Sequence, residues 1–226
     1  MSAPSLAAVL WDMDGTLVDT DPYWMAAETP LVESFGGVWN HEKSLALVGL
    51  GLDDAARVLQ EAGVRMAVHD IVDHLTSEVM RRIAEDGVPF RPGARELLAD
   101  LKASGTKTAL VTMSLRRMAT HVVEMIDFEA FNVVVAGDDV TRPKPYPDPY
   151  LRACELLDVE PTETVAIEDS PNGLRSAVAA GSVAIGVTSI VSLEGTGAHA
   201  VWPTLSGVTA SDLSELHRVQ SEKRRT

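Results

Sequence analysis

The residues of this sequence best suited to chemistry are two aspartates in the segment 12–16, Asp-Met-Asp-Gly-Thr. Asp12 directly follows the apolar run 6–11, which is typical of a buried strand. Side chains two positions apart on an extended chain point to the same side, so the carboxylates of Asp12 and Asp14 repel each other unless a cation or a shared proton lies between them. This arrangement favours a metal site.

The carboxylates of Asp12 and Asp14 could also have separate roles in phosphate transfer. One carboxylate can attack phosphorus while the other protonates the leaving oxygen, and Gly15 lets the backbone come close to a phosphate. The alternative is a turn with a helix N-cap, which explains Asp14 and Gly15 but leaves Asp12 unexplained. We therefore predict that Asp12 and Asp14 are catalytic.

A second acidic pair, Glu168 and Asp169, follows another apolar run at 165–167. Ser170 and Pro171 are typical of a helix N-cap and a first helical residue, which accounts for the polar residues after the pair but not for the pair itself. Two carboxylates at a second strand end could complete the oxygen coordination of Mg²⁺, a hard cation that prefers such ligands. We predict that both residues belong to the metal site.

Lys144 lies between Pro143 and Pro145. Two prolines restrict the backbone and favour an extended segment, which would fix the position of the ammonium group. A fixed cation could neutralise both a nucleophilic carboxylate and a transferring phosphoryl group. An ordinary proline-rich surface loop is the alternative.

Thr112 ends the apolar run 108–112 just before a helical pattern. Its hydroxyl, together with backbone amides that follow it, such as that of Met113, could hold phosphate oxygens. Taken alone, this position is better explained by a helix N-cap at Thr112 or Ser114.

These candidate residues need a scaffold that brings the ends of several strands together. Short runs rich in Val, Ile and Leu alternate with helical patterns, several of which open with Pro or Ser and close with Gly. The strands are predicted at 6–11, 108–112, 133–135, 165–167 and 183–187, and the helices at 93–104, 114–125, 147–157 and 171–180. Buried strands that alternate with helices predict an α/β fold, a doubly wound parallel sheet that binds ligands at its carboxyl edge.

Between the first and second predicted strands, residues 19–89 interrupt this alternation. No convincing strand occurs there, and the apolar residues recur at helical spacing. Pro and Gly at 87–93 suit a linker that returns to the sheet. We therefore predict a core formed by 1–18 and 90–226 and an inserted helical cap domain at 19–89.

Composition excludes several classes of function. The formal net charge of −14 over 226 residues argues against a nucleic-acid partner, because phosphate backbones are held by Lys and Arg clusters. No apolar stretch approaches the roughly 20 residues of a membrane helix, and the first residues do not fit a signal peptide, so we expect no membrane partner and a cytoplasmic location. Cys154, the single cysteine, fits a buried packing residue.

Taken in order, the Asp-Met-Asp-Gly-Thr segment, the strand-end Thr112, the proline-flanked Lys144 and the Glu168-Asp169 pair resemble the four motifs of the haloacid dehalogenase-like phosphohydrolase superfamily. The resemblance spans nearly the whole chain. It implies a Rossmann-like core with a mobile helical cap, close to the phosphoglycolate phosphatases, the sugar-phosphate phosphatases and the β-phosphoglucomutases.

The resemblance also implies a role for each residue. Asp12 would be the nucleophile that forms an aspartyl-phosphate, and Asp14 the general acid and then the general base. Mg²⁺ would be held by Asp12, the backbone carbonyl of Asp14 and Asp169, with Glu168 as a ligand or just beyond the ligands. Thr112, Met113 and Lys144 would bind the phosphoryl group. The namesake dehalogenases lack the second aspartate, so Asp14 argues against dehalogenation.

The expected activity is therefore Mg²⁺-dependent hydrolysis of a small phosphorylated metabolite, with sugar phosphates favoured by the resemblance and a monomer as the default state. A phosphosugar mutase of the β-phosphoglucomutase type is the main alternative. It is disfavoured because residues 44–51 contain no Arg or Lys, where mutases have cationic cap residues. A non-catalytic binding protein of the same fold is less favoured, since each core position holds a competent residue. Trp24 and Trp39 are expected to pack within the cap, and contact with the substrate is the alternative.

Overall fold

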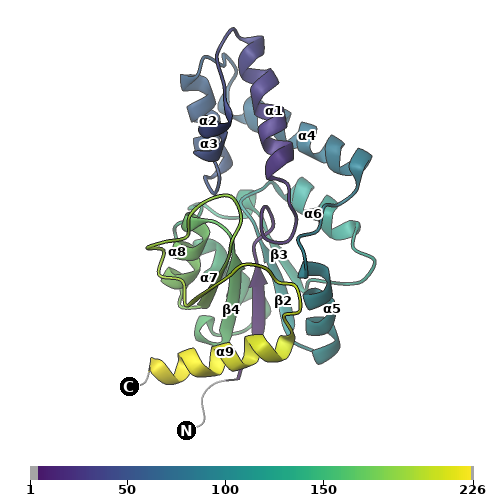
Figure 1. Cartoon of the computed structure of the whole chain (residues 1–226), viewed down its shortest axis with the longest axis vertical. Coiled ribbons are helices and arrows are strands. Elements are labelled where there is room, and N and C mark those ends of the chain that lie inside the picture. The colour runs from purple at the N-terminus through teal and green to yellow at the C-terminus, as the bar shows by residue number, and fades with distance from the viewer. Residues whose placement is uncertain (1–4, 225–226) are drawn as a thin grey trace.

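The computed structural model describes residues 5–224, and its core is a six-stranded sheet in the order β3-β2-β1-β4-β5-β6 (Figure 1). The strands are β1 (Ala8–Trp11), β2 (Lys107–Val111), β3 (Val133–Val135), β4 (Thr164–Glu168), β5 (Val183–Val187) and β6 (Ala200–Trp202). Every neighbouring pair is parallel. All carboxyl ends therefore meet at one edge, as the predicted doubly wound α/β fold requires.

Helices cover both faces of the sheet, and β1 shows why its sequence is apolar throughout. Val9 and Trp11 belong to one buried cluster, and Ala8 and Leu10 belong to another on the opposite face. The first cluster includes residues of α5 (Ala94–Ser104), α6 (Arg116–Glu124) and α9 (Ala210–Lys223). The second includes residues of α7 (Asp148–Leu157) and α8 (Pro171–Ala180). A strand buried on both sides has no polar face to expose.

The sequence analysis found the five long or buried strands and missed β6 and α9. β6 has three residues at the edge of the sheet, and Val201 is 49% exposed, so it lacks a strong apolar pattern. α9 is mostly polar but carries a capping box in which Thr209 and Asp212 bond each other's backbone amides, a signal the sequence did contain. Two short 3₁₀ segments, η1 (Gly137–Asp139) and η2 (Pro161–Glu163), complete the core.

Four helices fill the stretch between β1 and α5: α1 (Asp21–Ser34), α2 (His41–Leu45), α3 (Leu52–Glu61) and α4 (Val68–Asp86). They gather beyond the carboxyl edge of the sheet (Figure 1) and have a hydrophobic cluster of their own, which includes Val32, Leu59 and Ile71. The domain boundaries after Val18 and before Phe90 stay a prediction, and residues 1–4 and 225–226 of the predicted core lie outside the described residues. None of the helices within 5–224 has the length and hydropathy to cross a membrane.

The two chain segments that join these helices to the sheet run side by side. The amide of Asp19 donates to the carbonyl of Pro89 at 2.7 Å, and the amide of Arg91 donates to the carbonyl of Leu17 at 2.9 Å. An antiparallel bridge joins Val18 to Phe90. The helical segment therefore connects to the core through one paired, two-stranded neck.

Two further contacts hold the helical segment against the core. The side-chain amide of Asn172 at the start of α8 donates to the carbonyl of Gly49 at 3.0 Å. A Cβ at Gly49 would lie 2.7 Å from Cβ of Ser170, so only glycine allows this approach. On the other side, Arg117 of α6 donates to Asp73 of α4 at 3.0 Å. These contacts place the loop 46–51 over the carboxyl edge of the sheet.

The two ends of α5 offer a matched test of this packing. Gly93 and Gly105 have φ values of +84° and +75°, but a Cβ at Gly93 would lie 2.2 Å from the backbone of Leu205, whereas one at Gly105 would meet nothing within 4 Å. We expect Gly105→Ala to cost about 1 kcal/mol of unfolding free energy, the usual cost of a left-handed alanine. Gly93→Ala should cost clearly more, because the Leu205 backbone must also move. Equal losses in urea unfolding would contradict this account.

Candidate active site

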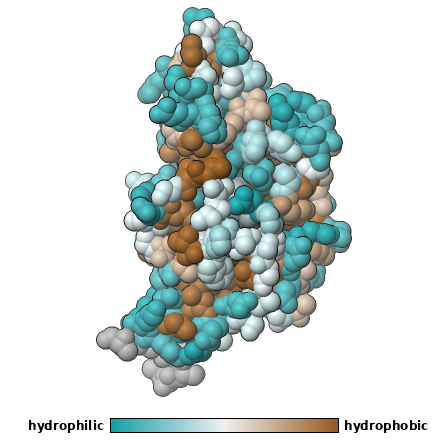
Figure 2. All heavy atoms as spheres, viewed as in Figure 1, coloured by the Kyte–Doolittle hydropathy of each residue, from teal (hydrophilic) through white to brown (hydrophobic). Residues whose placement is uncertain are grey.

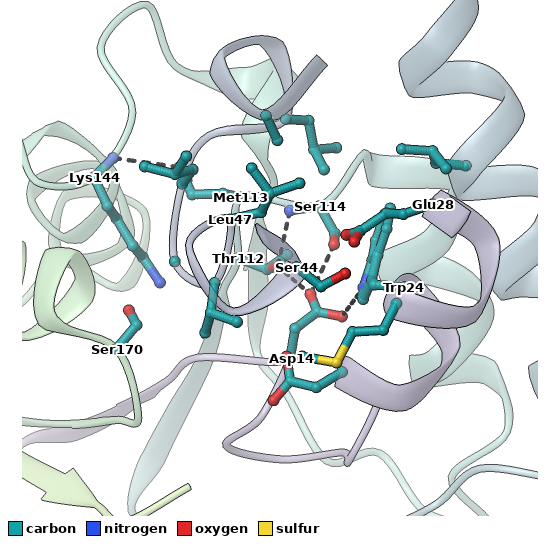
Figure 3. A pocket seen from close by; sticks show the side chains of 18 of the residues that line it. Asp14, Trp24, Glu28, Ser44, Leu47, Thr112, Met113, Ser114, Lys144 and Ser170 are labelled. Carbon is teal, nitrogen blue, oxygen red and sulfur yellow. Dashed lines mark hydrogen bonds between the residues drawn. The ribbon is translucent and has the colours of Figure 1, made fainter. Parts of the chain in front are cut away.

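A cavity of about 110 Å³ lies where the carboxyl edge of the sheet faces the helical segment (Figure 3). The space-filling view shows hydrophobic residues gathered near this junction (Figure 2). All but one of the residues predicted for the site line the cavity: Asp12, Asp14, Thr112, Met113, Lys144 and Asp169. The exception is Glu168, which is fully buried beneath it.

Lys144 is the charged group around which the floor of the cavity is arranged. Its Nζ donates to Asp12 Oδ1 at 2.7 Å, to Glu168 Oε1 at 2.6 Å and to the carbonyl of Val111 at 2.8 Å. Only 4% of the residue is exposed. Burial by itself would lower the pKa of Lys144, but the carboxylates of Asp12 and Glu168 outweigh that effect and raise the pKa above its usual value. The ammonium is therefore permanently charged and has all three of its protons bonded.

Glu168 accepts a hydrogen bond from Lys144 and does not line the cavity. Its Oε1 also accepts from the hydroxyl of Tyr150 at 2.6 Å, and its Oε2 accepts from Ser170 at 3.3 Å. A Cβ at Gly173 would lie 1.9 Å from Glu168 Oε2, so α8 can pass over the carboxylate only because a glycine stands there. Both carboxylate oxygens thus have protein partners, in contrast to Asp169.

Asp169 carries a buried oxygen that no protein group satisfies. Its Oδ1 accepts from Thr16 Oγ1 at 3.1 Å, whereas its Oδ2 has no hydrogen-bond partner among the described residues. The residue is 2% exposed, and burial, followed by the charges of Asp12 and Glu168, raises its pKa well above the usual range. Gly15, at φ +79°, packs so closely that a Cβ would lie 2.1 Å from this oxygen.

These carboxylates fit a divalent metal ion. Oxygens of Asp12, Glu168 and Asp169 lie within 4.8 Å of one another, and all three residues are buried. With Lys144 they leave two net negative charges when all are ionised, which one divalent cation would balance. The unpartnered Oδ2 of Asp169 is the kind of hard oxygen ligand that such an ion takes.

Burial and the neighbouring carboxylates also change the pKa of Asp12. Burial, and next the negative charge of Glu168, raise the pKa of Asp12 to about 8, although Lys144 opposes the shift. A carboxyl group must be ionised to act as a nucleophile. A cation beside Asp12 and Asp169 would favour the ionised form, because opposite charges stabilise each other in a buried site.

Asp14 faces the helical segment rather than the floor. Its Oδ1 accepts from Thr20 Oγ1 at 2.5 Å and from Trp24 Nε1 at 3.1 Å, and its Oδ2 accepts from Ser114 Oγ at 2.7 Å and from Thr112 Oγ1 at 3.3 Å. Four donors from two sides fix the orientation of this carboxylate, and Figure 3 shows those from Trp24, Thr112 and Ser114. A group held in this way on the cavity wall can exchange a proton with a bound molecule.

The segment 112–114 did not turn out to be a helix cap. α6 begins at Arg116 after Leu115, and no side chain caps it. The Thr112 hydroxyl accepts from the amide of Ser114 at 3.0 Å and donates to Asp14. The Met113 sulfur accepts from the amide of Lys144 at 3.3 Å, which ties this loop to the loop of the lysine. The polar side chains of this segment orient Asp14, and no side chain caps the N-terminus of α6.

The sequence analysis assigned no site role to several residues that the fold brings to the site. Trp24, expected to pack within the cap, donates to Asp14 and lines the cavity, and Thr20 lies one helical turn before it. Their spacing of four residues, from the N-cap Thr20 into α1, is a signal, because residues four apart lie on the same face of a helix. Glu28, one turn further along α1, also lines the cavity. The role of Tyr150 had no local signal, since it lies in an ordinary apolar helix pattern.

The fold and the site can now be compared with known proteins. The profile of the family described as haloacid dehalogenase-like hydrolase matches residues 9–187. The phosphorylated carbohydrates phosphatase of Thermotoga maritima is 32% identical over 180 residues, which are 78% of this chain and 82% of that protein. The crystal structure of CbbY from Rhodobacter sphaeroides in complex with xylulose-1,5-bisphosphate is similar with a TM-score of 0.81 and 28% identity, over 92% of this chain and 99% of that one.

β-Phosphoglucomutase from Clostridium difficile has a TM-score of 0.83 at 20% identity, over 95% of this chain and 98% of that one, which is a likeness of fold alone. The sequence match and the fold agree, and the match includes all four of the motifs described above. This chain belongs to the haloacid dehalogenase-like hydrolase family.

Proposed function

We propose that this protein is a Mg²⁺-dependent phosphatase that hydrolyses a small phosphorylated metabolite, a sugar or polyol phosphate, through an aspartyl-phosphate on Asp12. The observation that carries the proposal is the position of the Asp12 carboxylate at the cavity floor, 2.7 Å from Lys144 and in one cluster with Asp169. A nucleophile, a fixed cation and a metal-binding carboxylate thus surround one point where a phosphoryl group can sit.

In the first step, a carboxylate oxygen of Asp12 attacks phosphorus, and the bond from phosphorus to the leaving oxygen breaks. Asp14 donates its proton to that oxygen, so the leaving group departs as a neutral alcohol. The four hydrogen bonds to Asp14 hold it in one orientation for this transfer.

In the second step, Asp14, now ionised, takes a proton from water. The water oxygen attacks phosphorus, the bond to Asp12 breaks, and inorganic phosphate is released with Asp12 again a carboxylate. Asp14 regains the proton that it gave to the leaving group, so the two steps balance.

The surrounding residues stabilise the charge that moves between these groups. Lys144 holds Asp12 in place and faces the phosphoryl oxygens, and the Thr112–Met113 segment lies beside them. Mg²⁺ would be held by Asp12, the carbonyl of Asp14 and Asp169, with Glu168 behind, and would supply positive charge to the phosphoryl oxygens. The cap at 19–89 would cover the site and exclude water from competing positions.

Two considerations support a small carbohydrate-like substrate. The cavity of about 110 Å³ is well below the roughly 300 Å³ at which sites for drug-sized ligands begin. The Thermotoga maritima relative bears the name phosphorylated carbohydrates phosphatase. We also propose a cytoplasmic monomer, with which the free, buried thiol of Cys154 is compatible.

A phosphosugar mutase is the second candidate, because β-phosphoglucomutase shares this fold. A mutase must hold a bisphosphorylated intermediate and turn it around, which calls for cations on the cap side. The loop 46–51 lies over the site, and residues 47–50 of it line the cavity with apolar side chains and a glycine. The hydrolase therefore remains the better proposal.

Phosphate release from a panel of sugar, polyol and nucleotide phosphates tests the proposal directly. We expect release with Mg²⁺ and none with excess EDTA. Formation of glucose 6-phosphate from β-glucose 1-phosphate without free phosphate would favour the mutase. A protein that is inert towards the whole panel yet binds another macromolecule would favour the non-catalytic alternative.

Metal binding can be measured without turnover. We expect millimolar Mg²⁺ to raise the unfolding temperature, because a cation that binds only the folded state stabilises it, by about 2.7 kcal/mol at a hundred times its dissociation constant. Asp169→Asn should lose most of this shift, since it removes a charged ligand. Asp53→Asn, the same change at an exposed residue of α3, is the control. A full shift in Asp169→Asn would rule out Asp169 as a ligand.

The roles of the two aspartates are separable by trapping the intermediate. We expect Asp14→Asn to form phospho-Asp12 but to release phosphate about 10²- to 10⁴-fold more slowly, the usual contribution of a general base. Acid quenching and intact-protein mass spectrometry would detect the added phosphoryl group. Asp12→Asn should show neither the adduct nor turnover. Release from Asp14→Asn at the wild-type rate would remove Asp14 from the mechanism.

A further inference from the structure

The charges that line the catalytic cavity are strongly unbalanced. Among the described residues of its wall, Lys144 is the only cation, and its ammonium is already bound to Asp12 and Glu168. The carboxyl groups of the wall come from both the core and the helical segment: Asp12, Asp14, Asp21, Glu28 and Asp169. Asp12, Asp14 and Asp169 lie at the end of the cavity that would bind the phosphoryl group and the metal. Asp21 and Glu28 lie on α1, where the leaving group would sit.

Glu28 is the acidic group set furthest into the helical segment. It is 4% exposed, Trp39 Nε1 donates to its Oε2 at 3.0 Å, and Ser44 also bonds to it. Its carboxylate points into the cavity from α1, on the side opposite Lys144 (Figure 3). A carboxylate is costly to bury, and Trp39 and Ser44 can satisfy only part of its hydrogen-bonding capacity.

The rest of the wall around Glu28 is apolar and includes Leu47, Val72 and Leu75. A second phosphate or a carboxylate on the leaving group would enter this low-dielectric space beside a like charge, with no cation to offset the repulsion. A hydroxyl group, in contrast, can donate a hydrogen bond to Glu28 while the carbon chain contacts the apolar side chains.

The cationic side chain of a neighbouring cleft does not alter this balance. A neighbouring cleft of about 440 Å³ shares Asp21 and Met25 with the cavity and contains Arg91 and His41. Arg91 donates to the carbonyl of Thr188 at 2.8 Å and acts electrostatically on Asp21, and Asp19 lines the same cleft. The positive charge of Arg91 is thus balanced by the carboxylates of Asp19 and Asp21.

We propose that Glu28 is a specificity-determining residue, which makes this site select phosphate monoesters whose leaving group is uncharged and carries a hydroxyl group, and reject those with a second phosphate or a carboxylate. The inference rests on the proposed phosphatase function and narrows its substrates to neutral polyol and sugar monophosphates.

Matched substrate pairs test the proposal in the wild-type protein. Sorbitol 6-phosphate and 6-phosphogluconate differ by a hydroxymethyl group in place of a carboxylate, as do glycerol 3-phosphate and 3-phosphoglycerate. Fructose 6-phosphate and fructose 1,6-bisphosphate differ by the second phosphate. We expect kcat/KM to favour the neutral member of each pair by about tenfold or more, as like charges in a poorly solvated site repel strongly. Equal values within the pairs would overturn the proposal.

The variant Glu28→Gln assigns the preference to this residue. It removes the charge but keeps an oxygen for Trp39, so the ratio within each pair should fall by about tenfold while activity on the neutral member changes less. Glu33→Gln, the same change at an exposed position of α1, should leave the ratios as they are. Ratios in Glu28→Gln equal to those of the wild type would show that the selection does not come from Glu28.

Binding to Asp12→Asn, measured by calorimetry with the same pairs, separates this inference from the proposed function. Tighter binding of sorbitol 6-phosphate than of 6-phosphogluconate would support the selection even if the wild-type protein hydrolysed neither compound, a result that would reject the phosphatase alone. Equal binding of the two, or binding of neither, would reject the selection.

Discussion

The buried contact of Lys144 with Asp12 and Glu168 is the interaction on which the rest of the site depends. The ammonium gives all three protons to oxygens of the core, and almost none of the side chain reaches solvent. Removing one partner from such a group leaves an uncompensated charge, which typically costs about 3–5 kcal/mol. The fold must therefore bring the loops after β1 and β3 and the last residue of β4 to one point, and that point is the cavity floor.

The same contact explains why a cation belongs here. Lys144 balances one of the three neighbouring carboxylates, and burial penalises the remaining charge, as the raised pKa values of Asp12 and Asp169 indicate. Protonation would remove this buried negative charge, but a protonated carboxyl group cannot act as a nucleophile. A divalent ion would balance the charge and keep Asp12 ionised. The buried charges and the proposed chemistry therefore both favour a divalent cation beside Asp12 and Asp169.

The helical segment adds the second half of the cavity. Trp24 of α1 and its N-cap Thr20 donate to Asp14, and α1 also places Glu28 at the apolar part of the wall. In the proposed reaction the core would surround the phosphoryl group, and the helical segment would surround the leaving group. A change in α1 would then alter both the position of Asp14 and the choice of leaving group, because the same helix carries Trp24 and Glu28.

The amino-acid sequence by itself determined the class of fold, the positions of five strands along the chain and the residues of the floor. Apolar runs that end in Asp or Glu indicate strand ends at a parallel edge, and these signals are local. Ser170 was also correctly predicted as a helix N-cap, since its side chain accepts from Gly173. α9 could have been found from its capping box, whereas β6 is a short, partly exposed edge strand without a continuous run of Val, Ile or Leu.

The tertiary structure alone decided which groups meet. Adjacent residues of an extended chain point to opposite sides, but which of Glu168 and Asp169 faces the cavity could not be read from the sequence, because it depends on the packing of Lys144 and α8 against Glu168. Thr112 and Ser114 matched a helix cap locally, yet their hydroxyls bond Asp14, which is distant in sequence. Trp24 was expected to pack within the cap, and Glu28 was not singled out from the sequence. Their contacts depend on how the helical segment docks on the core, and that geometry arises from long-range packing that no local pattern encodes.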